Sequence, residues 1–556
     1  MSRSILEIPS TVGGRPRTRV VSRETYPHLR RDDNRLDTWR GYQYKAIHVF
    51  SIKRGWGVGY QAGERGRGLF YMGKTRQIRK ILIANRGEIS VRIMRTAKEL
   101  GIGSVAVYEK PDSEAYFIRL ADEAILIGDG PRKDYLDIER HIWAARKSGA
   151  DAIHPGYGFL AENPDFSAAC EREGILFIGP PPEVIRALGD KVVAREMMKK
   201  AGIPFIPGTD NLPPGDEGIR DAVAFGKKNG YPIMLKASLG GGGRGIRKVE
   251  GEPDLLVQLP LARTEARSAF GNESIYIEKC ITAPRHVEIQ ILADQKGNVI
   301  HLGSRDCSIQ RRHQKLLEIA PADLPPSVRE AMYEAAMAAA RQARYVNAGT
   351  VEFLVDSRTN EFWFMEVNTR LQVEHTVTEE LTGVDIVREQ IRIAEGHEID
   401  IPAERVHLHG KAVQVRINAE DPKNNFMPEG GKTVEVYQSP GGPGIRLDGV
   451  VYQGYTIPTD YDSLMVKMTV RGYDWEQTIG RLKRALLGFL IVGPKTTIPF
   501  YLAICDEPDF IKGKYDTGYI ETHPAIFDYP EAEREIAKLA KLVADIHVKK
   551  INPFAY

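Results

Sequence analysis

The chain has 556 residues, 42% of them hydrophobic and 27% charged, a composition typical of a soluble globular protein with several cores. No stretch approaches the roughly 20 uninterrupted apolar residues of a membrane span, so we expect no membrane association. The four cysteines show no CxxC pairing, which argues against a disulfide framework or a cysteine-rich zinc site and favours a cytoplasmic protein.

The formal net charge of +3 averages over two unlike parts of the chain. Residues 1–71 hold 14 Lys and Arg against 6 Asp and Glu, a net charge of +8, which leaves −5 for the rest. The main part of the chain therefore has no basic bias, and we do not expect it to bind nucleic acid.

Residues 1–77 lack helical or alternating periodicity and are rich in Gly and Arg, so we predict a disordered basic extension. Three interpretations are open: a targeting peptide, a basic tail that binds a partner, or translated sequence upstream of a true start at Met72. Acidic residues interrupt the segment, unlike a transit peptide, and it has no apolar signal-peptide core. Because recognisable structure begins soon after Met72, we favour the start-site interpretation.

From Arg79 the sequence alternates short apolar runs with amphipathic segments. The stretch KILIANRGEISVRIMRTAKELGIGSVAVYE predicts a strand, a glycine turn, a helix and a second strand, which make a βαβ unit. The runs ADEAILIG, GADAIHPGYG and GILFIGPP continue this pattern. We therefore predict an N-terminal α/β domain over residues 78–190, with a Rossmann-like parallel sheet and helices on its faces.

An α+β domain is predicted over residues 191–400, beginning with a helix near Asp190. Its strands SIYIEKC, HVEIQILAD, GTVEFLVD and EFWFMEVN accompany one alanine-rich helix around EAMYEAAMAAARQAR. A smaller mixed closing domain is predicted over residues 401–525, with strands KAVQVRINAE and KTVEVYQSP and a helix pair around WEQTIGRLKRALL. Residues 526–556 are predicted to form a charged, amphipathic helical tail.

Four successive glycines follow an apolar strand that ends in Lys236, within KASLGGGGRG. Glycines let the backbone approach a ligand and aim several N–H groups at one anion, and the lysine adds a positive charge. On the glycines alone, phosphate binding and a flexible hairpin are about equally supported. The run also matches GxGxxG, but the following IRKV is predicted as a strand instead of the helix that a dinucleotide site needs.

Five polar residues alternate along FWFMEVNTRLQVE, from Glu366 to Glu374. In a strand they share one face, following Phe362 and Phe364 on the same parity, so we predict a strand that runs out of the core into a site. A solvated edge strand is the alternative, but the apolar residues on the opposite parity argue against it. Carboxylate and amide oxygens suit Mg²⁺, with Glu352 in the preceding strand as a further ligand, and an adjacent arginine suits a small oxyanion.

A third segment, RDCSIQRRHQK, places Gln310, His313 and Lys315 among arginines. A single histidine is more often structural than functional. Because neighbouring cations disfavour its protonated form, we expect His313 to be a neutral hydrogen-bonding group near phosphate and not a metal ligand.

Together these segments resemble biotin carboxylases, members of the ATP-grasp superfamily. The resemblance spans about residues 78–525, and it implies an ATP-grasp domain over residues 191–400 with a lid at about 207–280. It also implies an ATP-dependent ligase that uses bicarbonate to carboxylate biotin through carboxyphosphate. The motifs that carry it are ILIANRGEI, HPGYGFLAEN, FIGP, KASLGGGGRG, PRHVEIQ, RDCSIQRRHQK, EVNTRLQVEH, RINAEDP and PTDYDSLMVK.

The resemblance implies an ATP site made of phosphate-binding lysines, the glycine loop, an adenine-binding segment and metal-binding carboxylates. Leu239 stands where many bacterial members have one more glycine, which leaves the phosphate-facing glycines in place. The metal ligands, for Mg²⁺ or Mn²⁺, are Glu352, Glu366 and Asn368. The ATP-binding residues are Lys191, Lys236, Gly242, Gly243, Glu278, Lys279, Cys280, Ile281, His286, Gln310, His313, Glu352 and Glu366.

Catalysis and bicarbonate binding are implied for a second group of residues. Glu374 is the expected general base for bicarbonate, and Arg416 is expected to bind biotin through its ureido group. The bicarbonate pocket is expected from Lys315, Arg370, Gln372 and Val373, and the catalytic set from Lys315, Arg370, Glu374 and Arg416.

The chain contains no AMKM biotinylation motif, and the similar string LMVKM lies in the predicted closing domain. We therefore expect biotin on a separate biotin carboxyl carrier protein, a carboxyltransferase subunit as a second partner, and a homodimer, as is common in the family. The final acceptor, which is acetyl-CoA, propionyl-CoA, pyruvate or another oxo acid, depends on the partner.

Two other functions compete with this one. A carbamoyl-phosphate-forming ATP-grasp ligase does not account for RDCSIQRRHQK and RINAEDP. A non-catalytic nucleotide-binding scaffold does not account for the presence of every expected catalytic side chain.

Overall fold

The computed structural model describes residues 10–12, 15–17, 75–238, 245–312, 314–402, 406 and 408–530. The chain divides into two units, one up to Tyr71 and one from Met72. In the first unit β1 (Ser10–Val12) pairs antiparallel with β2 (Arg15–Arg17), a hairpin that the sequence did not predict. The proposed start at Met72, the loop glycines Gly242 and Gly243, His313 and the helical tail from residue 531 lie outside the described residues.

The second unit opens with the predicted parallel sheet, whose strand order is β5-β4-β3-β6-β7. Its strands are apolar along their length because helices cover both faces, and Ile81, Leu82 and Ile83 are fully buried. The first strand ends in the turn ANRG, where the Asn85 side chain donates to the carbonyl oxygens of Pro155 (2.7 Å) and Tyr157 (2.8 Å). The strands are β3 (Lys80–Ile83), β4 (Gly103–Glu109), β5 (Glu123–Gly128), β6 (Ala152–His154) and β7 (Leu176–Phe177), and the helices are α1 (Gly87–Glu99), α2 (Tyr116–Leu120), α3 (Ile138–Ser148), α4 (Pro164–Arg172) and α5 (Pro182–Gly189).

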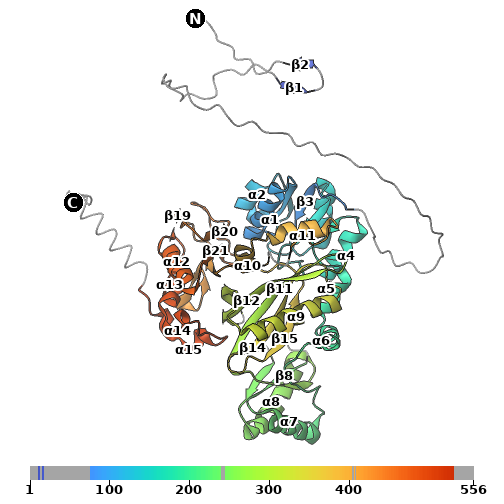
Figure 1. The fold of residues 1–556 in the computed structure, drawn as a ribbon, viewed down its shortest axis with the longest axis vertical. Helices are drawn as coiled ribbons and strands as arrows, with labels where there is room; N and C mark the ends of the chain where they lie inside the picture. Colours follow the sequence, from blue (N-terminus) through green and yellow to red (C-terminus); the bar gives the residue numbers. More distant parts are fainter. Residues whose placement is uncertain are drawn as a thin grey trace, which may run out of the picture. The chain divides into compact units, whose positions relative to one another are not determined.

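A small antiparallel sheet in the order β10-β8-β9 follows helix α6 (Lys191–Lys200). It has its own apolar core, in which Leu235, Ile277 and Leu259 are buried, and in Figure 1 it extends below the large sheet. Strand β9 follows the glycine loop as expected. The elements are α7 (Gly215–Asn229), β8 (Ile233–Ala237), β9 (Ile246–Val249), α8 (Glu252–Phe270) and β10 (Ile275–Lys279).

An eight-stranded antiparallel sheet in the order β15-β14-β11-β12-β13-β16-β21-β20 forms the centre of the second unit. Pairing between β13 and β16 joins the region before residue 400 to the region after it in one sheet. Helix α9 (Pro326–Gln342) packs its alanine-rich face on β11 and β14, and α10 (His375–Thr382) contacts β16 and β21 (Figure 1). The strands are β11 (Pro284–Ala293), β12 (Val299–Arg311), β13 (Gln314–Ala320), β14 (Asn347–Asp356), β15 (Phe362–Asn368), β16 (Lys411–Asn418), β20 (Ile445–Gly449) and β21 (Leu464–Gly472).

The remaining elements of this unit are short. Two two-stranded sheets, β17-β18 and β19-β22, accompany the closing helices. They are α11 (Ile386–Ala394), β17 (Glu420–Asp421), β18 (Met427–Pro428), β19 (Val436–Gln438), α12 (Trp475–Leu487), β22 (Leu490–Val492), α13 (Ile498–Asp506), α14 (Pro508–Ile511) and α15 (Tyr519–Thr522).

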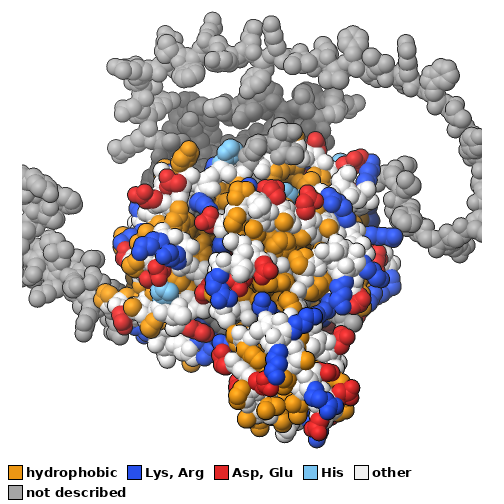
Figure 2. Space-filling view, turned by 60° about the horizontal axis from the view of Figure 1, so that its bottom comes forward, with side chains coloured by type: hydrophobic (Ala, Val, Ile, Leu, Met, Phe, Trp, Pro, Cys, Tyr) orange, Lys and Arg blue, Asp and Glu red, His pale blue; other side chains and the backbone are white. Residues whose placement is uncertain are grey.

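The surface of this unit carries charges of both signs. Figure 2 shows Lys and Arg side chains interspersed with Asp and Glu over the face in view. Within the part of the chain that the structure describes, none of the helices combines the length and the apolar character needed to cross a membrane.

Candidate active site

The polar residues expected on one strand face are divided by a β-bulge and a loop. In β15, Phe362 and Phe364 pair with Val355 and Phe353 of β14, and their side chains join the apolar core beneath α9. The register then shifts at Met365, so that Glu366 lies opposite Glu352. A bulge of this kind turns the following side chains to the other face of the sheet, which explains why one parity holds first apolar and then acidic residues.

The expectation of a continuous strand to Glu374 is wrong, because β15 ends at Asn368 and the chain turns into the loop before α10. The loop still directs its polar side chains to the sheet. Arg370 donates to Asn368 Oδ1 (3.0 Å) and to Gln372 Oε1 (3.1 Å), and its Nε donates to Glu162 Oε2 (2.8 Å) after β6. The residues predicted from the alternation are therefore brought together by the loop and not by the pleat of a strand.

Glu352 is the acceptor at the centre of this group. Its Oε1 accepts hydrogen bonds from Lys315 (2.9 Å), Asn368 (2.8 Å) and Gln372 (3.2 Å), and its Oε2 contacts His286 Nε2 (2.7 Å). Burial acts to raise the pKa of Glu352, but Lys315 and His286 outweigh it and hold this pKa well below its ordinary value. Burial acts to lower the pKa of His286, but Glu352 outweighs it and raises this pKa. Glu352 is thus an ionised carboxylate that stays charged through its neighbours.

Lys315 on β13 joins three carboxylates. Its Nζ donates to Glu288 (2.5 Å), Glu374 (2.7 Å) and Glu352 (2.9 Å), and 13% of its side chain is exposed. Burial opposes its charge, but the surrounding acidic groups raise the pKa of Lys315 well above its ordinary value. The ammonium therefore remains charged and fixes the mutual positions of groups that come from three strands and a loop.

Glu374, the predicted general base, is fully buried between two cations. One oxygen accepts from Lys315, and the other accepts from Arg416 of β16 (3.2 Å). Burial acts to raise the pKa of Glu374, but Lys315 and then Arg416 outweigh it and lower this pKa. The side chain is an anion held at the end of the loop, directly before α10 begins.

Three buried partners of these residues were not predicted. Glu288 on β11 binds both Lys315 and the fully buried Arg305, and Glu318 on β13 accepts from Arg416 Nε (2.8 Å). Each acid stands inside an apolar run, VEIQI and LLEIA, where a charge is costly unless it is paired. An isolated charge within an apolar strand was the signal that could have identified both of them.

Glu366 is the predicted metal ligand with the fewest protein partners. Among the described residues it forms no hydrogen bond or ion pair, and burial followed by the charge of Glu352 raises its pKa. Lys191, at the start of α6, is the nearby cation that opposes this shift. A divalent cation between Glu366 and Glu352 would relieve their repulsion, and the carboxylate oxygens with the Asn368 amide oxygen are hard donors of the kind that Mg²⁺ takes. The donor set therefore fits the expected metal.

The remaining predicted nucleotide contacts lie around the small sheet and the β12–β13 turn. Lys236 on β8 forms an ion pair with Glu278 on β10, which also lies 3.7 Å from Arg195 of α6. Lys279 ends β10, and the backbone N–H of Cys280 donates to Pro232 (3.1 Å), just before Ile281. Gln310 pairs in register with Lys315 across the turn. Among the described residues, neither Lys236 nor Glu278 contacts the network around Glu352.

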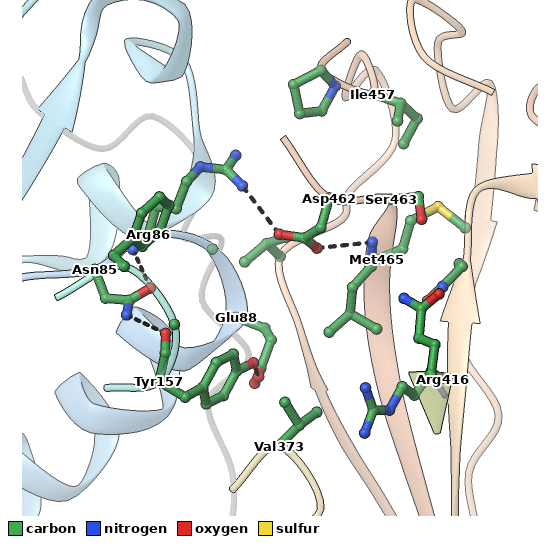
Figure 3. Close-up of a pocket in the computed structure, with 18 of the residues that line it drawn as sticks. Asn85, Arg86, Glu88, Tyr157, Val373, Arg416, Ile457, Asp462, Ser463 and Met465 are labelled. Carbon is green, nitrogen blue, oxygen red and sulfur yellow. Dashed lines mark hydrogen bonds and ion pairs between the residues drawn. The ribbon is translucent and has the colours of Figure 1, made fainter. Parts of the chain in front are cut away.

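A cavity of about 340 Å³ opens beside Arg416. Figure 3 shows it between the ANRG turn and α1 on one side and β16 and β21 on the other, with Glu88, Tyr157 and Val373 at its edge. An ion pair between Arg86 and Asp462 (3.8 Å) crosses it. The cavity gives a second molecule a route to the side of the network that is occupied by Arg416 and Glu374.

Three family models match successive parts of the chain. They are the biotin carboxylase N-terminal domain over residues 77–185, the carbamoyl-phosphate synthase L chain ATP-binding domain over residues 190–401, and the biotin carboxylase C-terminal domain over residues 414–522. The two flanking models belong to biotin carboxylases, which distinguishes this chain from a carbamoyl-phosphate-forming enzyme that shares only the middle one.

Individual relatives agree with these matches. The chain is 48% identical over 448 residues to Biotin carboxylase 1 of Bacillus subtilis, covering 80% of this chain and 99% of that one. It is also 48% identical over 481 residues to the pyruvate carboxylase of B. subtilis, covering 85% of this chain but only 41% of the relative. A solved structure, the biotin carboxylase domain dimer of Hydrogenobacter thermophilus 2-oxoglutarate carboxylase with MgADP, ADP and bicarbonate, is 48% identical, with a TM-score of 0.74 over 82% of this chain and 100% of that one.

Proposed function

The chain belongs to the biotin carboxylase family of ATP-dependent ligases, and we propose that it carboxylates biotin presented by a separate carrier protein. The observation that carries the proposal is the position of Glu374, a buried carboxylate between Lys315 and Arg416 at the edge of the cavity. A base, an anion-binding cation and an open approach for a second substrate thus meet at one point, which a scaffold subunit would not require.

Bicarbonate activation is the first step that the geometry supports. Bicarbonate is a weak nucleophile until it loses its proton, and Glu374 is an ionised acceptor for that proton. Lys315, Arg370 and Gln372 supply donors on the same side of the sheet, and bicarbonate bound to Lys315 would share that ammonium with Glu374. The carboxylate then becomes a stronger base at the moment that its substrate arrives.

Phosphoryl transfer requires groups that hold ATP in line with bicarbonate. Glu352, Glu366 and Asn368 would hold Mg²⁺, which neutralises charge on the transferring phosphate when bound. Lys191 and Lys236 would bind the phosphates, and Lys236 would exchange its ion pair with Glu278 for them. Attack by bicarbonate gives carboxyphosphate.

Carboxyl transfer follows on the other side of Glu374. Biotin entering the cavity would place its ureido oxygen at Arg416, whose guanidinium is held by Glu318 and stabilises the enolate formed when N1′ is deprotonated. Phosphate released from carboxyphosphate is the base for that proton. The CO₂ is then captured by N1′.

The partners and the compartment are inferred less directly. The B. subtilis biotin carboxylase matches over nearly its whole length, whereas the matched pyruvate carboxylase is much longer, and this favours a subunit that works with a carrier protein and a carboxyltransferase. A homodimer is favoured by the dimer of the H. thermophilus domain. The four cysteines are free thiols, in keeping with the cytoplasm.

The purified chain should cleave ATP only when bicarbonate is present, and free biotin should stimulate the rate. Release of ADP and phosphate, measured with each substrate omitted in turn, checks this. ATP turnover that needs neither bicarbonate nor biotin would contradict the proposal, and complete inactivity with retained nucleotide binding would favour the scaffold.

The Glu366→Gln variant should weaken the use of Mg·ATP because it removes the carboxylate that is free to bind the metal. One charge-assisted contact is worth roughly 1.5–3 kcal/mol, so the KM for ATP should rise at least about tenfold. Raising the Mg²⁺ concentration should recover part of the loss. A KM for ATP equal to that of the unmodified protein at every Mg²⁺ concentration would exclude Glu366 as a ligand.

A further inference from the structure

Lys467 on β21 is a fully buried lysine that the proposed function does not use. Its Nζ donates to the carbonyl oxygen of Val373 (2.8 Å) and forms an ion pair with Glu88 Oε1 (3.1 Å). A buried ammonium is costly unless it is paired and hydrogen-bonded, and here both requirements are met by groups from other parts of the chain. The cost of burying this charge directs attention to what its contacts hold in place.

The first of these contacts leads to the N-terminal sheet. Glu88 lies in the first turn of α1 and is 4% exposed, and the Tyr157 hydroxyl donates to the same oxygen that pairs with Lys467. The ammonium also lies 5.8 Å from the centre of the Tyr157 ring. Burial raises the pKa of Glu88, and Lys467 acts against that shift. Glu88 therefore depends on Lys467 for its charged form.

The second contact leads to the catalytic loop. Val373 stands between Gln372 and Glu374, so a hydrogen bond to its carbonyl oxygen fixes the peptide that joins them. His375 binds the preceding carbonyl oxygen, that of Gln372, through Nδ1 (2.7 Å). Two successive peptides of the loop are thus held by buried side chains.

The sheet places Lys467 beside Arg416. The two residues are direct partners across the antiparallel pair β16–β21, so their side chains leave the same face of the sheet next to each other. Arg416 binds the carboxylate of Glu374, while Lys467 binds the carbonyl oxygen of the residue before it. Val373, Glu88 and Tyr157 also line the cavity beside Arg416, as Figure 3 shows.

We propose that Lys467 is a positioning residue for carboxyl transfer, which holds the cavity wall formed by Glu88, Tyr157 and Val373 at a fixed distance from Glu374 and Arg416. The inference rests on the proposed function of the cavity as the entry for biotin. Lys467 touches no substrate in this scheme and acts through the groups that it binds.

The test compares biotin kinetics with ATP kinetics in Lys467→Met. Small displacements near a reacting centre cost up to about 100-fold, so kcat/KM for biotin should fall about 10- to 100-fold. The KM for ATP should change far less, and the ratio of biotin-stimulated to basal ATP cleavage should fall. A lysine that served the fold alone would affect both substrates together.

The single variant leaves Glu88 buried without its cation, so a second variant separates charge balance from positioning. In Lys467→Met/Glu88→Gln no charge is left unpaired, and thermal stability should recover while the biotin defect remains. Lys411→Met is the matched control, since Lys411 is a partly buried lysine of the adjacent β16 that donates to the carbonyl oxygen of Pro321 (3.2 Å). The control should keep the ratio of biotin-stimulated to basal cleavage.

Biotin kinetics restored to the unmodified values in the double variant would overturn the inference, because the lysine would then serve only to balance Glu88. An equal loss of biotin and ATP kinetics in Lys467→Met would overturn it as well. Failure of the unmodified protein to show bicarbonate-dependent, biotin-stimulated ATP cleavage would instead contradict the proposed function, and it is measured first.

Discussion

Replacing Glu374 by glutamine should reduce bicarbonate-dependent ATP cleavage by about 10²- to 10⁴-fold, the range typical of a lost general base. The amide keeps the shape of the side chain but cannot accept the proton of bicarbonate. Glu374 does not touch the predicted metal ligands and is separated from them by Lys315. The affinity for Mg·ATP should therefore be retained, as measured by nucleotide binding in the absence of bicarbonate.

A matched control is Glu380→Gln on the same helix, because Glu380 is only partly buried and lies 3.6 Å from Arg446, away from the site. Its turnover should match that of the unmodified protein. The comparison with Glu366→Gln is equally informative, since that variant should lose Mg·ATP affinity first. If both variants lost nucleotide affinity equally, the division of roles between Glu366 and Glu374 would be wrong.

The polar set of the site was accessible to sequence reasoning, but its geometry was not. Alternation in FWFMEVNTRLQVE indicated correctly that the chain leaves the core at Glu366. The bulge at Met365 and the end of β15 at Asn368 could not be read from it, because one residue inserted into a strand changes which face the following side chains occupy. The chemistry of the segment was predicted, and the backbone path that brings it together was not.

Partners across the sheet were the main omission. Glu288, Glu318 and Lys467 act on residues that are distant along the chain, and their identity depends on strand order and register. The order β14-β11-β12-β13-β16-β21 brings these strands next to one another, although their sequence order is different. Local periodicity defines the faces of an element but not its neighbour, so only a charge within an apolar run marked these positions.

The buried network holds acids and bases in alternation. Arg305 and Lys315 share Glu288, Lys315 and Arg416 share Glu374, and Arg416 ends on Glu318. Each charge is buried, so each depends on its neighbours for compensation, and removing one leaves its partners exposed to the full cost of burial. Such a chain fixes one arrangement of the base and the cations on both sides of it.

Replacing Lys315 by methionine should therefore have the largest combined effect on activity and stability. It leaves Glu288, Glu352 and Glu374 without their shared cation, and breaking a buried pair in this way costs about 3–5 kcal/mol. Bicarbonate-dependent turnover should fall at least about 100-fold, since both the anion-binding ammonium and the placement of the base are lost. Melting temperature and ATP cleavage measure the two effects separately.

The pH dependence gives the sign that distinguishes lost charge from lost packing. In the unmodified protein the lowered pKa values of Glu352 and Glu374 contribute stability above the ordinary carboxyl pKa of about 4.3, and this contribution is lost as the pH falls through the lowered values. Without Lys315, burial raises the pKa of the unpaired carboxyls, so the folded variant binds more protons than its unfolded chain and loses stability as the pH rises. The gap in melting temperature between the two proteins should widen from about pH 5 to pH 8, and adding Glu288→Gln should narrow it without restoring turnover. A gap that is the same at every pH would show that Lys315 contributes packing alone.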